Sequence, residues 1–298
     1  MNRSRKQFLS CFARIPVLLL RARRLRYSNP SLRRRAVPVR PSCTAQAGAI
    51  GRTRGNPHPP SRVKPAHMIK VASYNIHKGI GLDRRRNPER VVEVLREIDA
   101  DVIALQEADR RFGTRACVLP YHLLEEHSDW KPIPVSLSAL SMGWHGNVVL
   151  VRKSAVIVDS EAIHLPSLEP RGAVMADVRT TGGMIRVVGM HLDLSGLWRR
   201  RQAAAVLAHV DACATRHPTV LMGDLNEWSA GSGCLRDFGR DFAFADTGAS
   251  FHSRRAIARL DRIMASRDLR IASCGVHSSA AARKASDHLP IWATLEPA

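Results

Sequence analysis

The chain has 298 residues, and its 46 lysines and arginines against 26 aspartates and glutamates give a formal net charge of +20. The excess lies in residues 1–67, which hold 16 basic and no acidic residues, whereas the rest of the chain holds 30 basic and 26 acidic residues. This division excludes one uniformly basic nucleic-acid-binding domain. It predicts a basic segment, residues 1–67, followed by one large domain, residues 68–298, which is the candidate catalytic domain.

The basic segment is rich in arginine and proline, a composition typical of disorder. Its longest apolar stretch, residues 15–20, contains Pro16 and is far shorter than the roughly 20 residues of a membrane helix. Two interpretations stay open. Met68 is the true start of the protein, or the segment is an arm that binds anionic lipid or nucleic acid. We expect a cytoplasmic protein, and such an arm would hold it at a membrane surface.

The six cysteines contain no Cys-x-x-Cys pair, so neither a disulfide framework nor a cysteine zinc site is predicted. Scattered thiols of this kind fit a reducing compartment. No stable protein partner is implied by the sequence, and we expect a monomer.

In chain order, residues 69–76 alternate apolar and polar side chains and predict a strand. Asn87 and Pro88 are typical of a helix start, and the apolar positions that follow predict a helix to residue 98. Residues 102–106 predict a buried strand, and 108–145 predict loops with a short helix. A helix is predicted over 197–215, and further strands over 147–152, 156–158, 173–179, 184–190, 219–222, 258–264, 270–276 and 289–295. This order favours an α/β protein built on packed sheets.

Polar side chains recur where these predicted strands end or begin. An aspartate after a strand is by itself usually a turn or capping residue, and a lone histidine is usually structural. A repeated occurrence at one topological position instead predicts a site at the edge of a sheet. The residues concerned are Asn75, His77, Glu107, His191, Asp193, Asp224, Asn226, Asp261, Asp287 and His288.

The residue types indicate the chemistry. Carboxylate and amide oxygens suit Mg²⁺ or Mn²⁺, whereas zinc would prefer more histidine or cysteine. Two histidines with acids nearby can supply the base and the acid of a hydrolysis at neutral pH. Attack on a phosphodiester needs offset charge, a positioned water and a partner for the leaving group, and this set contains all three.

Five strings occur in order, and together they resemble the endonuclease/exonuclease/phosphatase family, in particular its small bacterial members. They are Ser73-Tyr-Asn-Ile-His-Lys-Gly79, Ile103-Ala-Leu-Gln-Glu107, Gly223-Asp-Leu-Asn226, Leu260-Asp-Arg-Ile263 and Ser286-Asp-His-Leu-Pro290. The resemblance covers residues 69–295. It implies a four-layered α/β sandwich with two central mixed β-sheets flanked by helices.

The resemblance also implies roles. Glu107 would be the principal metal ligand, with Asn75 beside it and Asp287 at the edge of the metal site. Asp224 and Asn226 would hold the attacking water and the scissile phosphate. His288, oriented by Asp261, would contact a phosphate oxygen or take a proton, and His191 would be the second catalytic histidine.

Several positions stay open in this comparison. His77 stands where some members have an acidic residue, so it contacts phosphate, ligates the metal weakly or packs. Asp193 is similarly undecided, and Asn147 and Arg171 either line the phosphate pocket or are structural. The run Arg199–Arg201 is a solvated face or steers an anionic substrate.

We therefore expect a divalent-metal-dependent phosphoric ester hydrolase, a phosphodiesterase that acts by in-line attack of water at phosphorus. The substrate is nucleic acid, or a phospholipid or other small phosphodiester, and the nearly neutral domain argues against tight binding to a duplex. The alternatives are a catalytically silent binding or scaffold protein of the same fold, and a protein whose basic segment is its functional part, as a membrane or nucleic-acid tether.

Overall fold

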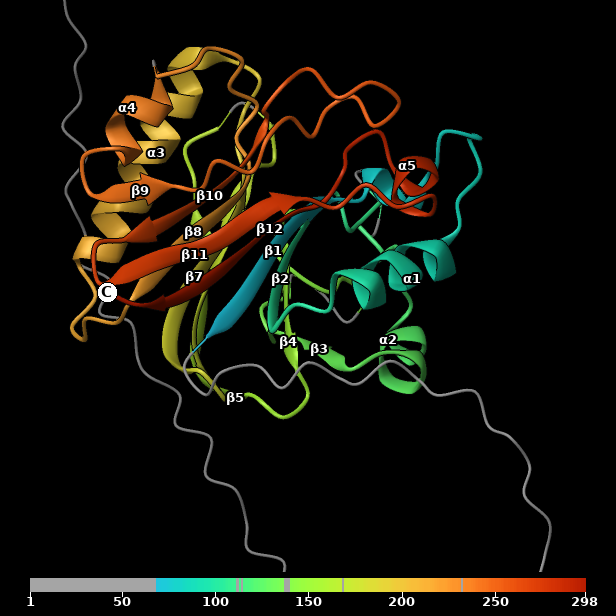
Figure 1. The fold of residues 1–298 in the computed structure, drawn as a ribbon, viewed down its shortest axis with the longest axis horizontal. Coiled ribbons are helices and arrows are strands. Elements are labelled where there is room, and N and C mark those ends of the chain that lie inside the picture. The colour runs from blue at the N-terminus through green and yellow to red at the C-terminus, as the bar shows by residue number, and fades with distance from the viewer. Residues whose placement is uncertain (1–67, 111–112, 114, 137–139, 168, 232) are drawn as a thin grey trace, which may run out of the picture. The chain divides into compact units, whose positions relative to one another are not determined.

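The computed structural model describes residues 68–298 except 111–112, 114, 137–139, 168 and 232, so the predicted basic segment lies outside the described residues. The described part contains two six-stranded mixed sheets with helices on their outer faces (Figure 1). The first sheet has the order β11 (Leu269–Val276), β12 (Ile291–Pro297), β1 (Ile69–Asn75), β2 (Val102–Gln106), β4 (Val148–Arg152) and β3 (Trp130–Pro132). The second has the order β5 (Val156–His164), β6 (Gly172–Thr180), β7 (Gly183–His191), β8 (Thr219–Asp224), β10 (Asp261–Ser266) and β9 (Phe242–Phe244).

Each sheet has one parallel pair at its centre, and the register of these pairs places the polar strand ends together. In the first sheet β1 runs parallel to β2, with Asn75 opposite Gln106. In the second sheet β7 runs parallel to β8, with His191 opposite Asp224. The first residue of β10, Asp261, also lies opposite Asp224, because β10 is antiparallel to β8.

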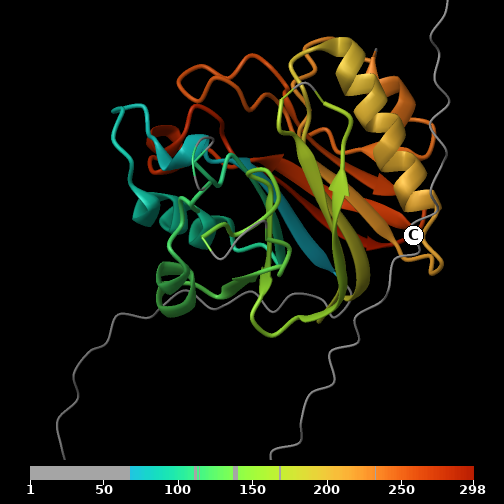
Figure 2. The ribbon, with the colours of Figure 1, turned by 180° about the vertical axis from the view of Figure 1, so that it is seen from behind.

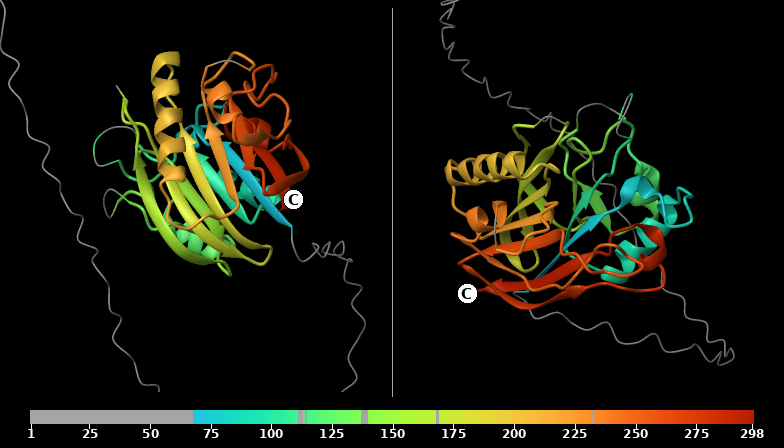
Figure 3. Two further views of the ribbon diagram at one scale, coloured as in Figure 1. Left: turned by 90° about the vertical axis from the view of Figure 1, so that its left-hand side faces the viewer. Right: turned by 90° about the horizontal axis from the view of Figure 1, so that it is seen from above.

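Three apolar clusters make the four layers. One lies between the sheets and is built from inward-facing residues of both, such as Val71, Val187 and Ile263. The second joins the outer face of the first sheet to α1 (Pro88–Ile98), α2 (Tyr121–His127) and α5 (Ala282–Ala285). The third joins the outer face of the second sheet to α3 (Gly196–Asp211) and α4 (Cys234–Phe238). The two groups of helices lie on opposite sides of the sheets (Figures 2 and 3), which confirms the predicted sandwich.

The first helix follows directly from its sequence. The side chain of Asn87 accepts a hydrogen bond of 2.7 Å from the backbone nitrogen of Arg90, and Pro88 occupies the first turn. The buried positions of α1 recur at helical spacing and pack on the first sheet. The helix ends at Ile98, and its capping residue Asp99 has left-handed backbone angles.

The structure differs from the sequence prediction mainly in short or exposed elements. Strand β5 runs on to His164, beyond the predicted end at residue 158. The sequence did not indicate this length, because most side chains of the strand are partly or fully exposed and do not alternate clearly. Helix α3 ends at Asp211 rather than at residue 215, and β10 begins at Asp261 rather than at 258. The elements α4, α5 and β9, of three to five residues, were too short to leave a periodic pattern.

The four cysteines within the described residues are all free thiols. Within the same residues, no helix has the length and apolar character that crossing a bilayer requires.

Candidate active site

The polar strand ends of both sheets meet around one carboxylate, that of Asp224. Its Oδ2 accepts a hydrogen bond of 3.0 Å from Nδ2 of Asn75, which comes from the other sheet. The same oxygen lies 3.5 Å from Nε2 of His191 and 3.7 Å from Nε2 of His288. Its Oδ1 accepts a bond of 2.9 Å from the backbone nitrogen of Asn226. The side chain is almost fully buried, so every one of these contacts is shielded from bulk water.

The glycine before Asp224 is required by the close approach of β7. A Cβ atom at Gly223 would lie 1.9 Å from the carbonyl oxygen of Met190, and Gly223 has φ +155°. Because only glycine can adopt this backbone beside a neighbouring strand, the Gly-Asp pair places the carboxylate at a fixed position.

His288 and Asp261 form a buried pair. Nδ1 of His288 donates a hydrogen bond of 2.8 Å to Oδ2 of Asp261, and the hydroxyl of Ser250 donates to the same oxygen. Burial by itself would lower the pKa of His288, but the charge and hydrogen bond of Asp261, with the charges of Asp224 and Asp287, raise it to about 10. His288 is therefore an imidazolium at neutral pH.

His191 has the opposite charge state. Burial lowers the pKa of His191 to about 3, against the opposing charge of Asp224 and with a further contribution from Arg171. Nη1 of Arg171 donates a hydrogen bond of 2.8 Å to Nε2 of His191. Because that nitrogen accepts, the ring is neutral and carries its proton on Nδ1. The site thus holds one charged and one neutral histidine on either side of the Asp224 carboxylate.

Glu107 directly follows Gln106, the last residue of β2, which pairs with Asn75 of β1. Its Oε2 contacts Nζ of Lys78, and about a quarter of each side chain is exposed. Both residues line a small polar cavity, together with Asp109, Arg115, His145, Pro170, Arg171 and His191. The predicted principal metal ligand therefore faces the same cavity as Arg171 and His191.

Several non-glycine residues of this region have left-handed backbone angles, which cost roughly 1–3 kcal/mol each where the side chain is not glycine. They include His77 (φ 44°), Lys78 (φ 57°), Glu107 (φ 54°) and Asn226 (φ 50°). The surrounding hydrogen bonds impose this conformation. The nitrogen of His77 donates to Oδ1 of Asn75, and that of Lys78 donates to the carbonyl oxygen of Glu107.

The predicted metal ligands are Asn75, Glu107 and Asp287, and their donor set fits a hard divalent cation. All three offer oxygen atoms, and Glu107 reaches the cavity. Among the described residues, Asp224, Asp261 and His288 also bring ligand atoms close together. In this cluster, Nδ1 of His288 is bonded to Asp261 at 2.8 Å, and Nε2 lies 3.7 Å from Asp224.

Of the positions that the sequence left undecided, His77 borders the site, whereas Asn147 and Asp193 make structural contacts. His77 donates from Nδ1 to the carbonyl oxygen of Ile80 at 3.2 Å and lies 3.7 Å from Asp287, so it borders the site. Asn147 mainly joins strands, since its Nδ2 donates to the carbonyl oxygen of Gly172 at 2.9 Å. Asp193 caps the loop before α3 by accepting a bond of 2.9 Å from the nitrogen of Ser195.

The arginine run is only partly a solvated face. Arg199 is buried, and its Nη2 lies 3.1 Å from Oε2 of the equally buried Glu227. It also donates to the carbonyl oxygens of Asp193 and Leu194. This side chain therefore ties together the loops that follow β7 and β8, on which His191 and Asp224 depend for their position.

Sequence reasoning missed several residues of the site. Lys78 is part of the first family string, so its position there was a usable signal. Arg115 donates to Asp109 at 2.9 Å and to Nδ1 of His145, and it comes from a segment without periodicity. Burial, followed by the charge of Arg115, lowers the pKa of His145. Ser250, which supports Asp261, had no sequence signal at all.

An aromatic column leads from the buried pair to the surface. The ring of Phe251 lies 4.9 Å from that of His288, and the ring of Trp228 lies 6.0 Å from that of Phe251. Trp228 is 64% exposed, and the exposed apolar side chains of Leu194 and Ile257 belong to neighbouring loops. Apolar and aromatic side chains thus follow the loops that carry the site.

Comparison with known proteins identifies a family for this arrangement. The sequence model described as "Endonuclease/Exonuclease/phosphatase family" matches residues 72–288, which is most of the chain. The uncharacterized protein YbhP of Escherichia coli (strain K12) is 28% identical over 175 residues, covering 54% of this chain and 67% of that protein.

Solved structures show the same fold at low sequence identity. An endonuclease/exonuclease/phosphatase from Bacteroides vulgatus has a TM-score of 0.63 and 19% identity, and it covers 78% of this chain and 99% of its own. D. rerio TDP2 complexed with a single-strand DNA product has a TM-score of 0.61 and 17% identity, with 77% and 99% covered. A mannosyl-6-phosphatase from Bacteroides thetaiotaomicron has a TM-score of 0.59 and 18% identity, with 76% and 99% covered.

Proposed function

Because the chain belongs to the Endonuclease/Exonuclease/phosphatase family, we propose that it is a divalent-metal-dependent hydrolase of phosphoric esters that acts by in-line attack of water at phosphorus. The observation that carries the proposal is the buried carboxylate of Asp224, held by Asn75 between a neutral His191 and a charged His288. A carboxylate with an imidazolium beside it can take a proton from water on one side while a proton is given to the leaving group on the other.

The proton steps follow from the charge states. Asp224 orients a water molecule and accepts its proton as the new oxygen–phosphorus bond forms. His288 enters the reaction as an imidazolium, so it donates a proton to the departing oxygen as the old phosphorus–oxygen bond breaks. Asp261 stabilises that charged ring and fixes its orientation. His288 therefore acts as an acid or charge stabiliser rather than as the base.

Arg171 and Lys78 are the basic residues that would contact the phosphate in the cavity. Nη1 of Arg171 donates a hydrogen bond to His191, and its buried Nε has no partner among the described residues. Lys78 adds a flexible positive charge in the same cavity. The neutral state of His191 lets it serve as a fixed hydrogen-bond partner without adding charge, and Asn226 completes the polar surface near Asp224.

The residues that would hold the cation are Glu107, Asn75 and Asp287. A bound Mg²⁺ or Mn²⁺ would offset the negative charge that develops on the phosphate oxygens. Lys78 contacts one oxygen of Glu107, Oε2, so its ammonium group would compete with a cation for that carboxylate.

A phosphodiester with an apolar or aromatic group is the favoured substrate. Trp228 presents an exposed ring that contacts Phe251, and Phe251 in turn contacts His288, the proposed donor to the leaving group. A nucleobase can stack on such a ring, and an apolar chain can lie against it together with Leu194. A structural neighbour was solved with a single-strand DNA product, and another acts as a mannosyl-6-phosphatase, so nucleic acid and smaller esters both belong in the test.

The test is a hydrolysis screen of the purified chain with Mg²⁺ against DNA, RNA, sphingomyelin, phosphatidyl lipids and inositol phosphates. We expect release of product from at least one class and its loss in Asp224→Asn, a change that keeps the size of the side chain. If the folded protein hydrolyses none of them with Mg²⁺ or Mn²⁺, or if Asp224→Asn is equally active, the proposal fails. A folded protein that binds one of them without hydrolysis would support the scaffold alternative.

A further inference from the structure

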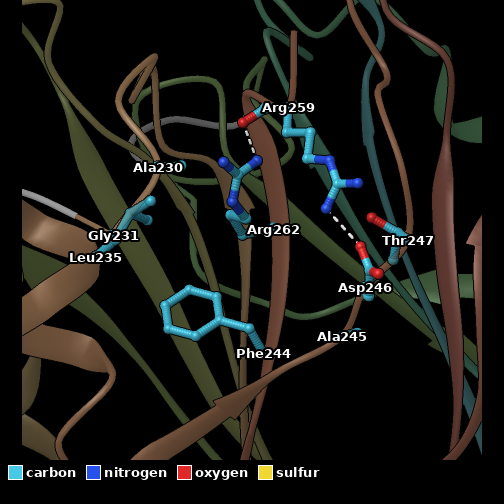
Figure 4. A pocket seen from close by; sticks show the side chains of 9 residues that line it. All are labelled: Ala230, Gly231, Leu235, Phe244, Ala245, Asp246, Thr247, Arg259 and Arg262. Atoms are coloured by element: carbon cyan, nitrogen blue, oxygen red, sulfur yellow. Dashed lines mark hydrogen bonds and ion pairs between the residues drawn. The ribbon is translucent and has the colours of Figure 1, made fainter.

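A second cavity lies on the outer face of the second sheet, away from the site around Asp224. It has a volume of about 350 Å³ and lies between the loop after β8, helix α4 and the strands β9 and β10 (Figure 4). Its walls are largely apolar and include Leu235, Phe244 and Ala245, whereas Asp246, Arg259 and Arg262 supply the charged groups. None of its lining residues belongs to the proposed catalytic set.

The separation of the two sites follows from the alternation of side chains along β10. Asp261 and Arg262 are consecutive, so their side chains point to opposite faces of the sheet. Asp261 reaches His288 on one face. Arg262 projects from the other face and lines the cavity together with Phe244, and Figure 4 shows its guanidinium directed toward the carbonyl oxygen of Arg259.

The guanidinium of Arg262 has only backbone acceptors. Its Nη1 donates to the carbonyl oxygens of Arg259 and, at 3.0 Å, of Asp261. No carboxylate within the described part of the chain lies at ion-pair distance from it. The nearby Asp246 pairs with Arg259. Nε and Nη2 of Arg262 likewise have no acceptor among these residues, so several donors remain for a ligand.

A charge in such surroundings is costly without a counter-ion. Burial lowers the pKa of Arg262, with Asp261 opposing the effect and Arg259 adding to it. Charged side chains in protein interiors are normally paired, because a partly desolvated cation is stabilised by an anion in contact with it. An anion that donates two oxygens to the planar guanidinium would meet this need.

We propose that this cavity binds a small organic anion, with its carboxylate or phosphate group on Arg262 and its apolar part against Phe244 and Leu235. The cavity volume falls within the range of about 300–1,000 Å³ that is typical of small-molecule sites. Few polar groups among apolar walls are also typical of such sites, where the polar groups fix the orientation of the ligand. Arg259 lies at the exposed side and is paired with Asp246, so the unpaired positive charge of the cavity is that of Arg262.

The experiment is a titration of the full chain followed by methyl NMR, with the methyl groups of Leu235, Ala245 and Thr247 as reporters. Benzoate and phenyl phosphate serve as probes, and benzyl alcohol is the neutral control of similar shape. We expect saturable shifts of the three reporters with at least one anion and none with benzyl alcohol. The two anions distinguish a carboxylate from a phosphate ligand. The ring signals of His191 and His288 report any separate binding at the catalytic site.

Two variants and one control variant test the assignment. Arg262→Met keeps the aliphatic stem and removes the charge, and it should weaken binding by about tenfold or more, because a charge-assisted contact is lost. Arg270→Met, an exposed arginine on β11 paired with Glu296, is the matched control and should bind as the wild type does. Ala230→Trp fills the exposed mouth of the cavity and should abolish the shifts without disturbing the core.

Three results would overturn the proposal: no reporter shift with either anion, equal binding by benzyl alcohol, or unchanged affinity in both Arg262→Met and Ala230→Trp. If Arg262→Met does not fold, Ala230→Trp alone decides. Because the reporters lie in the cavity, a protein without hydrolytic activity would still give a clear answer.

Discussion

The side-chain amide of Asn75 donates a hydrogen bond of 3.0 Å to the carboxylate of Asp224, and this bond connects the two sheets at the site. Asn75 is the last residue of β1, and Asp224 is the last residue of β8. The distance between the proposed metal ligands on the first sheet and the histidines around Asp224 therefore depends on this contact. Any change in the packing of one sheet on the other is transmitted directly to the reacting groups.

Asn75→Leu should lower the free energy of unfolding by about 1–3 kcal/mol, because it leaves the buried Asp224 without one of its donors. Urea unfolding measures the change. In an Asp224→Ala background the same substitution should cost clearly less, since the bond is already absent. Equal costs in the two backgrounds would show that the hydrogen bond does not carry the effect.

His288→Ala and Asp261→Asn should each lower turnover by about two orders of magnitude or more, because Asp261 orients and charges the proposed proton donor. The double variant should be little worse than the worse single variant, since the two residues act as one unit. Steady-state kinetics on the substrate found by the screen give the values, and circular dichroism confirms folding of these buried changes. If the two defects multiply fully in the double variant, His288 and Asp261 do not act as one unit.

The stability of the protein should depend on His191 in mildly acidic solution. Its pKa is lowered in the folded state, so the unfolded chain binds the additional proton first as the pH falls. The stability that the neutral ring contributes is present above about pH 6.5 and is lost progressively toward pH 3, with a slope of at most about 1.4 kcal/mol per pH unit.

Unfolding by urea across this pH range, compared between the wild type and His191→Gln, isolates the contribution. The stability difference should shrink as the pH falls. His122→Gln, a change at an exposed position of α2, is the control and should leave the pH dependence unaltered. A difference between wild type and His191→Gln that is constant with pH contradicts the buried neutral ring.

Chelation should abolish hydrolysis, and added Mg²⁺ or Mn²⁺ should restore it. Lys78→Met should bind Mn²⁺ more tightly than the wild type, because the ammonium no longer competes for Glu107. Glu107→Gln should bind it more weakly. Calorimetric titration with Mn²⁺ gives both affinities without reference to activity. Full hydrolysis in excess chelator, or equal affinity in all three proteins, would argue against a metal at Glu107.

Trp228→Ala should raise KM for a substrate with an aromatic or apolar group by about tenfold or more, since stacking on an exposed ring contributes roughly 1–3 kcal/mol. Turnover at saturation should change less, because Trp228 does not touch the reacting groups directly. Leu197→Ala, another exposed apolar residue, serves as the control. An unchanged KM would mean that the substrate does not extend over Trp228.

Much of the fold was predictable because its central strands are short apolar runs bounded by polar residues. The same property made the site visible: Asn75, Glu107, His191 and Asp224 all stand at the ends of buried strands, and the registers bring those ends together. The charge states were not predictable. His191 and His288 each stand beside an apolar strand in the sequence. The fold makes His191 neutral chiefly by burying it, and it makes His288 charged by placing Asp261 beside it.

The rest of the site lies on loops whose residues meet through folding rather than through any local pattern. Arg115 and His145 are separated by 30 residues and come from segments without periodicity. Ser250 reaches Asp261 from a loop that precedes β10. Arg262 looked like any polar residue in a strand, and its cavity exists only because α4 and β9, too short to predict, cover that face of the sheet.

The left-handed backbone at Glu107 has a consequence for protein engineering. Glycine adopts these angles more readily than glutamate does, so Glu107→Gly relieves the local cost while it removes the side chain on which cation binding depends. A library selected only for resistance to heat or protease would therefore enrich glycine at Glu107 and Asn226, whereas selection for turnover would remove it. The positions at which those two selections disagree would outline the working residues of the protein without any knowledge of its substrate.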